Sequence, residues 1–242
     1  MKRNISLLLL ALLTVLSVNA QTKDKDSGLK VDASIDVYSL HLWRGFKSGD
    51  APSVEPVLGF TFNEKWNFSI WGAYSLDEKY QEVDMWVSYT PNNNFSFTLF
   101  DYYDPNTMPF DEKAFDFGKK TSEHLFEGVV DYTNNKIPLR FKAGLIFYGN
   151  DRDEKGDNYY SLYLEAGYTQ KIIENLAIDF YIGGAPYKGL YSDKAAIVNV
   201  GSTLLSSLTI GKKYIIPITA QYVWNPYASN TFFRVGASFT LF

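Results

Sequence analysis

The sequence has no cysteine among its 242 residues and only two histidines, and these absences exclude several kinds of protein. Without cysteine the chain has no disulfide framework, no cysteine-based metal site and no lipid-modified cysteine to anchor a lipoprotein. The formal net charge is -4, and the sequence shows no footprint of a nucleic-acid-binding protein. From residue 31 onward, no segment has the period of a long amphipathic helix, and no apolar run reaches the length of a transmembrane helix.

Aromatic residues, in contrast, are abundant, with 18 Tyr and 18 Phe, yet the mean hydropathy is only -0.17. A chain that is rich in aromatics and hydrophilic on average must keep the two kinds of residue apart, and β-strands do so by alternation. Residues 66–76 alternate most clearly. Trp66, Phe68, Ile70 and Tyr74 share one parity, and mostly small or polar residues occupy the other.

Stretches of strand length recur along the chain, and the connections between them also alternate. Tight turns such as residues 63–65 and 91–94 alternate along the chain with longer, more charged connections such as residues 104–121 and 149–158. Short turns at one end, long loops at the other and an even strand count are typical of bacterial outer-membrane barrels. We therefore predict an all-β fold, an antiparallel up-and-down transmembrane β-barrel of about 12 strands.

Aromatic side chains on the outward parity gather near strand ends. Trp66 and Tyr74 bracket one strand, Tyr214 and Trp224 bracket another, and Tyr89, Tyr132 and Tyr168 precede tight turns. Membrane barrels place such girdles at the level of the lipid headgroups. A soluble β-sandwich, which is the alternative fold, has no reason to place Tyr and Trp at both rims of its outward face.

Charged residues on the opposite parity are predicted to face a wet lumen, because burying unpaired ions in a dry core costs several kcal/mol each. These residues are Asp32, Asp36, Glu55, Glu82, Asp84, Glu123, Glu127, Asp131, Arg140, Lys142, Glu165 and Asp179. Acids outnumber bases, which predicts a preference for cations. Arg140 and Lys142 form a basic ladder on the seventh strand, expected opposite Glu127 and Asp131. Barrels of this size lie between filled and open ones, so an open and a plugged lumen both remain possible.

Residues 1–20 have the pattern of a cleaved signal peptide. Lys2 and Arg3 give the positive start, residues 7–16 the apolar core, and residues 18–20 the small-residue cleavage site. Residues 21–30 are predicted to be a short polar leader, and residues 31–242 a single barrel domain. The expected location is the outer membrane of a Gram-negative bacterium, in contact with its lipid and lipopolysaccharide.

The last predicted strand, residues 231–242, alternates and ends on Phe242. Chain ends usually fray into water, so a terminal strand closed by an aromatic residue indicates neighbours on both sides. Outer-membrane barrels typically end in this way. That resemblance implies that the barrel-assembly machinery is a partner, which recognises the C-terminal strand ending in Phe242. Phe242 has the opposite parity to Phe239 and Leu241, so the direction in which it faces stays open.

The first predicted hairpin begins with an aromatic-rich strand over residues 36–46 that carries Arg44 and Gly45, continues to Pro52 and returns in a strand over residues 54–62. This layout resembles the start of the TorF family of porin-like proteins. The family begins with an aromatic-x-Arg-Gly strand and continues through hairpins to a terminal Phe. The resemblance implies a porin-like barrel and does not identify a solute.

The longest connection is expected to be functional or mobile. It carries Phe110, Asp111, Glu112, Phe115, Asp116 and Lys119. One hypothesis is that this loop folds into the mouth as a constriction, and the alternative is an extracellular cap.

Signals for chemistry are few. A hydrolase in the barrel wall would have to use His41 or His124, expected on the first and sixth strands, and neither has a serine at a His-x-Ser spacing. Residues 151–158 resemble a calcium loop, but Lys155 occupies a ligand position. We therefore predict a passive channel for small hydrophilic solutes or ions, without enzyme activity, cofactor, metal or nucleic-acid partner. The alternatives are a barrel hydrolase acting on lipid or lipopolysaccharide and a closed barrel with ligand-binding loops.

Overall fold

The computed structural model describes residues 28–105, 112–134, 136–211 and 214–241. The predicted signal peptide, most of the predicted leader, and Phe110, Asp111 and Phe242 lie outside the described residues. Within those ranges the chain consists of β-strands and one short 3-10 helix, η1 (Glu112–Phe115). No helix in this part of the chain is long and apolar enough to cross a membrane.

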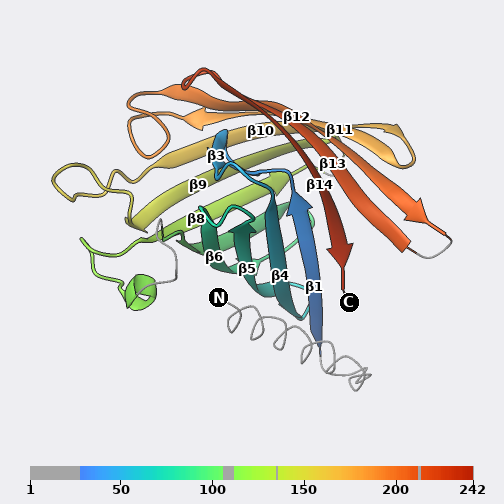
Figure 1. The fold of residues 1–242 in the computed structure, drawn as a ribbon, viewed down its shortest axis with the longest axis horizontal. Coiled ribbons are helices and arrows are strands. Elements are labelled where there is room, and N and C mark those ends of the chain that lie inside the picture. Colours follow the sequence, from blue (N-terminus) through green and yellow to red (C-terminus); the bar gives the residue numbers. More distant parts are fainter. Residues whose placement is uncertain (1–27, 106–111, 135, 212–213, 242) are drawn as a thin grey trace.

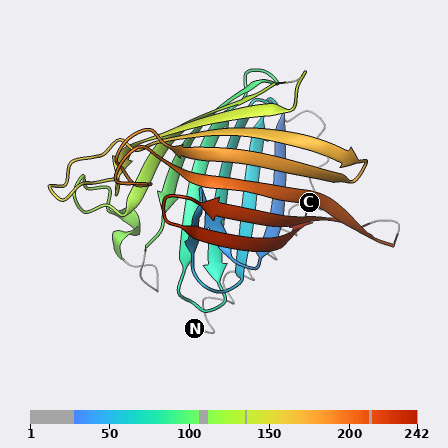
Figure 2. The same cartoon turned by 90° about the horizontal axis from the view of Figure 1, so that it is seen from above.

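Twelve strands form one closed antiparallel barrel, which confirms the predicted fold class and strand number. They are β1 (Leu29–Tyr38), β4 (Ser53–Phe62), β5 (Trp66–Ser75), β6 (Gln81–Tyr89), β7 (Phe95–Tyr103), β8 (His124–Thr133), β9 (Leu139–Gly149), β10 (Leu162–Ile173), β11 (Leu176–Ala185), β12 (Ala196–Ile210), β13 (Tyr214–Asn225) and β14 (Asn230–Thr240). The ring closes because β1 pairs with β4 on one side and with β14 on the other (Figures 1 and 2). β1 begins at Leu29, inside the segment predicted to be leader.

The two ends of the barrel differ in the length of their connections. At one end, residues 63–65 join β4 to β5 and residues 174–175 join β10 to β11. At the other end, residues 104–123 join β7 to β8 and residues 150–161 join β9 to β10. The termini of the barrel lie at the end with tight turns, as expected for an outer-membrane barrel.

Side chains alternate between the two faces of the wall. In β5, Trp66 and Tyr74 are 48% and 40% exposed on the outer face, whereas Ser69 and Ser75 are 4% and 1% exposed on the inner face. The rings of Trp66 and Tyr89 lie 4.5 Å apart and form part of an aromatic rim near the tight turns. The outer wall is therefore apolar, with aromatic residues at its edges.

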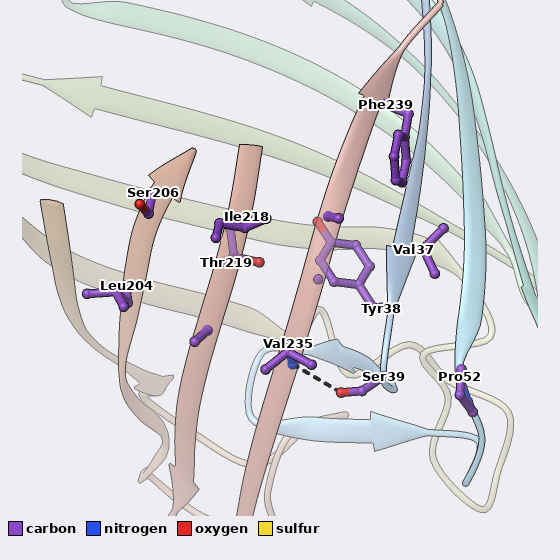
Figure 3. A pocket seen from close by; sticks show the side chains of 13 residues that line it. Val37, Tyr38, Ser39, Pro52, Leu204, Ser206, Ile218, Thr219, Val235 and Phe239 are labelled. Atoms are coloured by element: carbon purple, nitrogen blue, oxygen red, sulfur yellow. Dashed lines mark hydrogen bonds between the residues drawn. The ribbon is translucent and has the colours of Figure 1, made fainter. Parts of the chain in front are cut away.

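The seam between β1 and β14 is a short junction. The ladder pairs Ser34 to Tyr38 with Gly236 to Thr240, and Ser39 extends it through two hydrogen bonds with Val235, of 2.8 and 3.0 Å (Figure 3). β13 pairs with β14 only as far as Ala237, and Figure 1 shows β12 and β13 extending away from β14 beyond that point. An apolar groove of about 660 Å³ lies here on the outer wall (Figure 3).

A second, two-stranded sheet forms inside the connection between β1 and β4. It consists of β2 (His41–Trp43) and β3 (Phe46–Ser48), and we call residues 41–48 the internal hairpin. The prediction of a first strand that continues to residue 46 and carries His41 is wrong, because β1 ends at Tyr38. The turn of the internal hairpin is formed by Arg44 and Gly45, which both have positive φ angles, 48° and 88°. Alternation alone does not reveal such a reversal.

Candidate functional site

The internal hairpin lies inside the barrel, near the end that carries the long loops. Trp43 and Phe46 pack against a buried cluster. Its members are Ile146, Tyr163, Ala185, Tyr191 and Val198. A side chain at Gly45 would overlap the carbonyl oxygen of Val198 in β12, and Asn225 of β13 donates a hydrogen bond of 3.2 Å to the Gly45 carbonyl. The internal hairpin therefore crosses the lumen from β1 and β4 to the opposite wall.

Arg44 fixes the internal hairpin to the barrel wall. Its guanidinium donates to both carboxylate oxygens of Glu127 in β8, at 2.6 and 2.8 Å, and also to the Tyr191 hydroxyl. The rings of Trp43 and Tyr163 lie 4.7 and 4.6 Å from the guanidinium carbon. The side chains of Arg44 and Glu127 are only 9% and 0% exposed. Such burial is tolerated because the bidentate pair satisfies both charges.

Glu127 has a third partner, the Tyr102 hydroxyl of β7, which donates a hydrogen bond of 2.8 Å. Gly144 of β9 leaves room for this carboxylate, since a side chain there would overlap it. Arg44 and Glu127 were each predicted from the sequence, but their pairing was not. Tyr102, Tyr163 and Tyr191 were missed, although inward parity on β7 could have indicated Tyr102.

Between the internal hairpin and the wall lies a cavity of about 470 Å³, which we call the lumen cavity. Its lining divides into two walls. The aromatic wall comes from β5, β6 and β7 and consists of Trp71, Trp86, Phe100 and Tyr102. The polar wall comes from β9 to β13 and consists of Arg140, Lys142, Tyr163, Glu165, Asp179, Tyr181, Asn199, Thr203 and Gln221. His41, Trp43 and Arg44 of the internal hairpin, with Glu82 and Asp84 of β6, complete the lining.

The polar wall is organised by Arg140. Its guanidinium donates to Glu165 and to Asp179, each at 2.6 Å. Thr169 donates to Asp179 at 2.8 Å, and the Tyr163 hydroxyl donates to Glu165 at 2.6 Å. The charges of this wall are therefore largely paired with one another. The Arg140 side chain is 30% exposed, so these pairs are more accessible to water than the Arg44 pair.

The expected opposition of Arg140 and Lys142 to Glu127 and Asp131 is corrected in part. Lys142 pairs with Asp131 at 2.9 Å. Glu127, in contrast, lies opposite Ile146 in the β8–β9 register and binds Arg44. Strand alternation predicts neither the bulge next to Glu127 in the β8–β9 ladder nor the internal hairpin.

The remaining predicted lumen residues lie in four places. Glu82 and Asp84 line the lumen cavity, whereas Asp32 and Asp36 lie on β1, where Asp36 accepts a hydrogen bond of 3.2 Å from Tyr38. Glu55 binds the His41 imidazole at 2.9 Å. Glu123 precedes β8 and pairs with Lys113 of the long loop at 2.6 Å, so it does not line the lumen cavity.

The long loop does not constrict the lumen in its described part. Phe117 packs on His124 and Phe126 of β8. These two residues lie opposite Tyr103 and Asp101, which are on the outward-facing side of β7, so Phe117 packs on the outer face of the wall. Phe115 is 88% exposed, and η1 lies well outside the barrel in Figure 2. The described residues of this loop, Glu112, Phe115, Asp116 and Lys119 among them, do not line the lumen cavity. The inward element is therefore the internal hairpin.

Asp104 and Asp116 show how this loop is held. Burial raises the pKa of the Asp104 carboxyl to about 7, and the nearby Glu82 carboxylate adds to the shift. Hydrogen bonds from the Thr121 hydroxyl and the Gly118 amide lower the pKa of Asp116 below its ordinary value. The turn at Asp116 is thus held by its own hydrogen bonds, and Asp104 lies in the field of Glu82 at the rim.

Neither histidine has the geometry of a Ser–His–acid hydrolase. The Ser53 hydroxyl donates to Glu55 at 2.7 Å and not to His41. At His124, Nδ1 binds Asp101 at 2.7 Å and Nε2 binds the Ala114 carbonyl at 3.2 Å. No group of three or more His, Cys, Asp or Glu residues in the described ranges is placed to hold a metal ion.

Comparison with solved structures finds barrels that are similar to this one. No protein-family model matches the chain, and no curated protein matches it. The solved KdgM porin is similar with a TM-score of 0.48 and 10% identity, over 88% of this chain and 100% of that chain. An outer membrane channel from Pseudomonas putida F1 has a TM-score of 0.44 and 10% identity, over 91% and 98%. A BenF-like porin from Pseudomonas fluorescens Pf-5 has a TM-score of 0.35 and 12% identity, over 90% and 65%. Likenesses this distant say nothing about the solute.

Proposed function

We propose that this protein is an outer-membrane channel for small hydrophilic solutes, narrowed by its internal hairpin. The observation that carries the proposal is the sidedness of the closed wall, which is apolar outside and polar inside around a cavity of about 470 Å³. A soluble barrel of this size would have to expose its apolar face to water, whereas a membrane barrel turns that face to lipid.

Strand length supports a membrane location. The barrel strands run from 9 residues in β6 and β7 to 15 residues in β12. A tilted strand needs about 9–11 residues to cross the hydrocarbon core of a bilayer. Every backbone group in such a span needs a partner, and a closed ring of ladders provides one for nearly all of them.

The internal hairpin explains why the channel would be narrow. A barrel of twelve strands lies between the filled eight-stranded ones and the open porins of sixteen strands. Here the end of the lumen beneath the long loops is occupied by the internal hairpin, which Arg44 anchors. Passage then depends on the space beside the internal hairpin or on its displacement.

Three finer features belong to the same proposal. A relation to the TorF family is proposed on the resemblance of the Arg44–Gly45 segment alone. The excess of acids on the inward parity supports a cation preference, which Asp84→Asn should weaken as a shift of the reversal potential toward zero in a salt gradient. Contact with lipopolysaccharide and recognition of the C-terminal strand by the assembly machinery follow from an outer-membrane location.

The test is single-channel recording on the mature chain, residues 21–242, refolded and inserted in a planar bilayer. A heat shift in gel mobility serves as the control for folding. Discrete conductance steps would support the channel. A folded, heat-modifiable barrel that never conducts, even when the internal hairpin is released by Arg44→Ala, would refute it.

A further inference from the structure

We infer that the lumen cavity is a binding site for neutral sugars, so that the solute class of the channel is carbohydrate. This inference rests on the proposed function for transport but not for binding. It comes from the division of the lumen cavity into an aromatic wall and a polar wall, which face each other across the ring of strands.

The aromatic wall is continuous from Trp86 to Tyr102. The ring of Trp86 lies 5.6 Å from that of Phe100, and Phe100 lies 5.1 Å from Tyr102, with planes only 7° apart. Tyr102 then meets Trp43 of the internal hairpin at 5.9 Å. Rings from β6, β7 and the internal hairpin therefore form one apolar surface that leads through the lumen toward the internal hairpin.

The polar wall lies on the other side of the ring. In the closed order of strands, β6 and β12 are half a turn apart, and so are β7 and β13. Trp86 therefore faces the side of Asn199 and Thr203, and Phe100 faces the side of Gln221. Gln221 donates to Tyr181 at 2.7 Å, but its carbonyl oxygen is buried without a hydrogen-bond partner in the described ranges.

A solute that satisfies both walls needs an apolar face and a rim of hydroxyl groups. A pyranose ring has this form, because its C–H bonds lie on its faces and its hydroxyls lie around its edge. A planar aromatic compound would stack but leave the carbonyl oxygen of Gln221 without a hydrogen-bond donor, which is costly once water is displaced. A linear polyol would offer hydroxyls without a flat apolar face.

The charge balance of the lumen cavity favours a neutral sugar over an acidic one. Arg140 is shared between Glu165 and Asp179, Arg44 is paired with Glu127, and Lys142 is paired with Asp131. An anionic solute would have to break one of these pairs to find a counterion, whereas hydroxyl groups can join them. Glu82 and Asp84, which also line the lumen cavity, add negative charge and further acceptors for hydroxyl groups. The volume of about 470 Å³ lies within the ordinary range for small-molecule sites.

The experiment measures binding and transport separately. Three of the five tryptophans, Trp43, Trp71 and Trp86, line the lumen cavity, so maltose is titrated against intrinsic fluorescence of the detergent-folded protein, with sorbitol as the linear polyol. Maltose is expected to give a saturable change and sorbitol none. Trp86→Leu and Phe100→Leu should each raise the maltose Kd by about threefold to tenfold, as expected for loss of one ring contact. Trp66→Leu on the outer rim is the matched control and should leave the Kd unchanged.

Planar-bilayer recording then separates the two proposals. Channel current that maltose interrupts and sorbitol does not, with weaker interruption in Trp86→Leu, supports sugar as the solute. Conductance without any maltose effect, together with flat fluorescence titrations, overturns the sugar site and leaves the channel standing. Saturable maltose binding in a barrel that never conducts supports the sugar site and overturns the channel. Equal Kd values in wild type and both cavity variants, each shown to be folded by its heat shift, also overturn the sugar site.

Discussion

Arg44 and Arg140 each hold carboxylates inside the same barrel, but they do so at different levels of burial. The Arg44 side chain is 9% exposed and its partner Glu127 is fully buried, in a shell of tyrosine and tryptophan. The Arg140 side chain is 30% exposed and its partners line the lumen cavity. The buried Arg44 pair therefore fixes the internal hairpin, whereas the more accessible Arg140 pairs line the lumen cavity.

The difference determines what each pair contributes. Removing one partner of a buried ion pair leaves a desolvated charge, which costs about 3–5 kcal/mol. An accessible pair is screened by water, and its loss costs about 0–1 kcal/mol. Similar contact distances thus predict very different consequences at the two sites, and variants can test whether the distinction holds.

The largest effect is expected for Arg44→Ala. This change leaves Glu127 buried without its cation and should lower the free energy of unfolding by about 3–5 kcal/mol. It should also release the internal hairpin and raise the single-channel conductance. Urea unfolding in detergent, followed by tryptophan fluorescence, gives the stability, and bilayer recording gives the conductance.

A double variant, Arg44→Met with Glu127→Leu, separates the charge from the packing. With both charges gone no ion is left unpaired, so most of the lost stability should return. The comparison would fail if the double variant were as unstable as Arg44→Ala, because the loss would then come from packing alone.

The next effect concerns the turn of the internal hairpin. Gly45 and Gly156 both have positive φ angles, 88° and 83°, but only at Gly45 would a side chain overlap backbone. Ala at either position carries about 1–2 kcal/mol of backbone strain. Gly45→Ala should therefore destabilise the protein more than Gly156→Ala and raise the conductance, which Gly156→Ala should leave unchanged. Equal unfolding midpoints and equal conductance for the two variants would contradict a closely packed turn.

A pH effect is expected where the internal hairpin meets the rim. Asp104 has a folded-state pKa of about 7, above the ordinary 3.8, because of burial and the neighbouring Glu82. The native state therefore binds this proton more tightly than the unfolded state, and stability falls as pH rises from about 4 to about 7. His41 and Glu123 also act on Asp104, so they contribute to the local field. Urea midpoints between pH 4 and 8 should fall in the wild type and fall less in Asp104→Asn; parallel curves would contradict the raised pKa.

A smaller effect is expected at the accessible pair. Arg140→Ala should lower the free energy of unfolding by less than Arg44→Ala does, because Glu165 and Asp179 are 11% and 13% exposed and keep some access to water once the guanidinium is gone, whereas Glu127 is fully buried. The same urea experiment measures it beside Arg44→Ala. Losses of equal size at Arg44 and Arg140 would mean that burial does not distinguish the two sites.

Sequence periodicity was sufficient for the barrel because it depends on local geometry. Alternation on β5 follows from the strand itself, and the tight turns over residues 63–65 follow from their composition. The same reasoning could not find the internal hairpin. Its reversal at Arg44 and Gly45 is held by contacts with Tyr191, Val198 and Asn225, which are distant in the sequence.

The partners of the ions were likewise hidden from the sequence. The parity of the strand residues placed Glu127 and Arg140 on inward faces. It could not show that Glu127 pairs with Arg44, because the two residues are 83 positions apart and Arg44 lies in the turn of the internal hairpin. Asp131 and Lys142 face each other across neighbouring strands, and for such a pair register alone is enough.

The smallest expected effect is a change in conductance on shortening the long loop, and here we expect none. Deleting residues 112–119 removes η1 and Phe117, which pack against the outer side of β7 and β8 rather than in the lumen cavity. Loss of the contacts at His124 should lower stability slightly while the conductance stays at the wild-type value. Recording this deletion beside Arg44→Ala tests which element narrows the lumen: a rise in conductance only in Arg44→Ala assigns that role to the internal hairpin, and a rise only in the deletion would return it to the long loop.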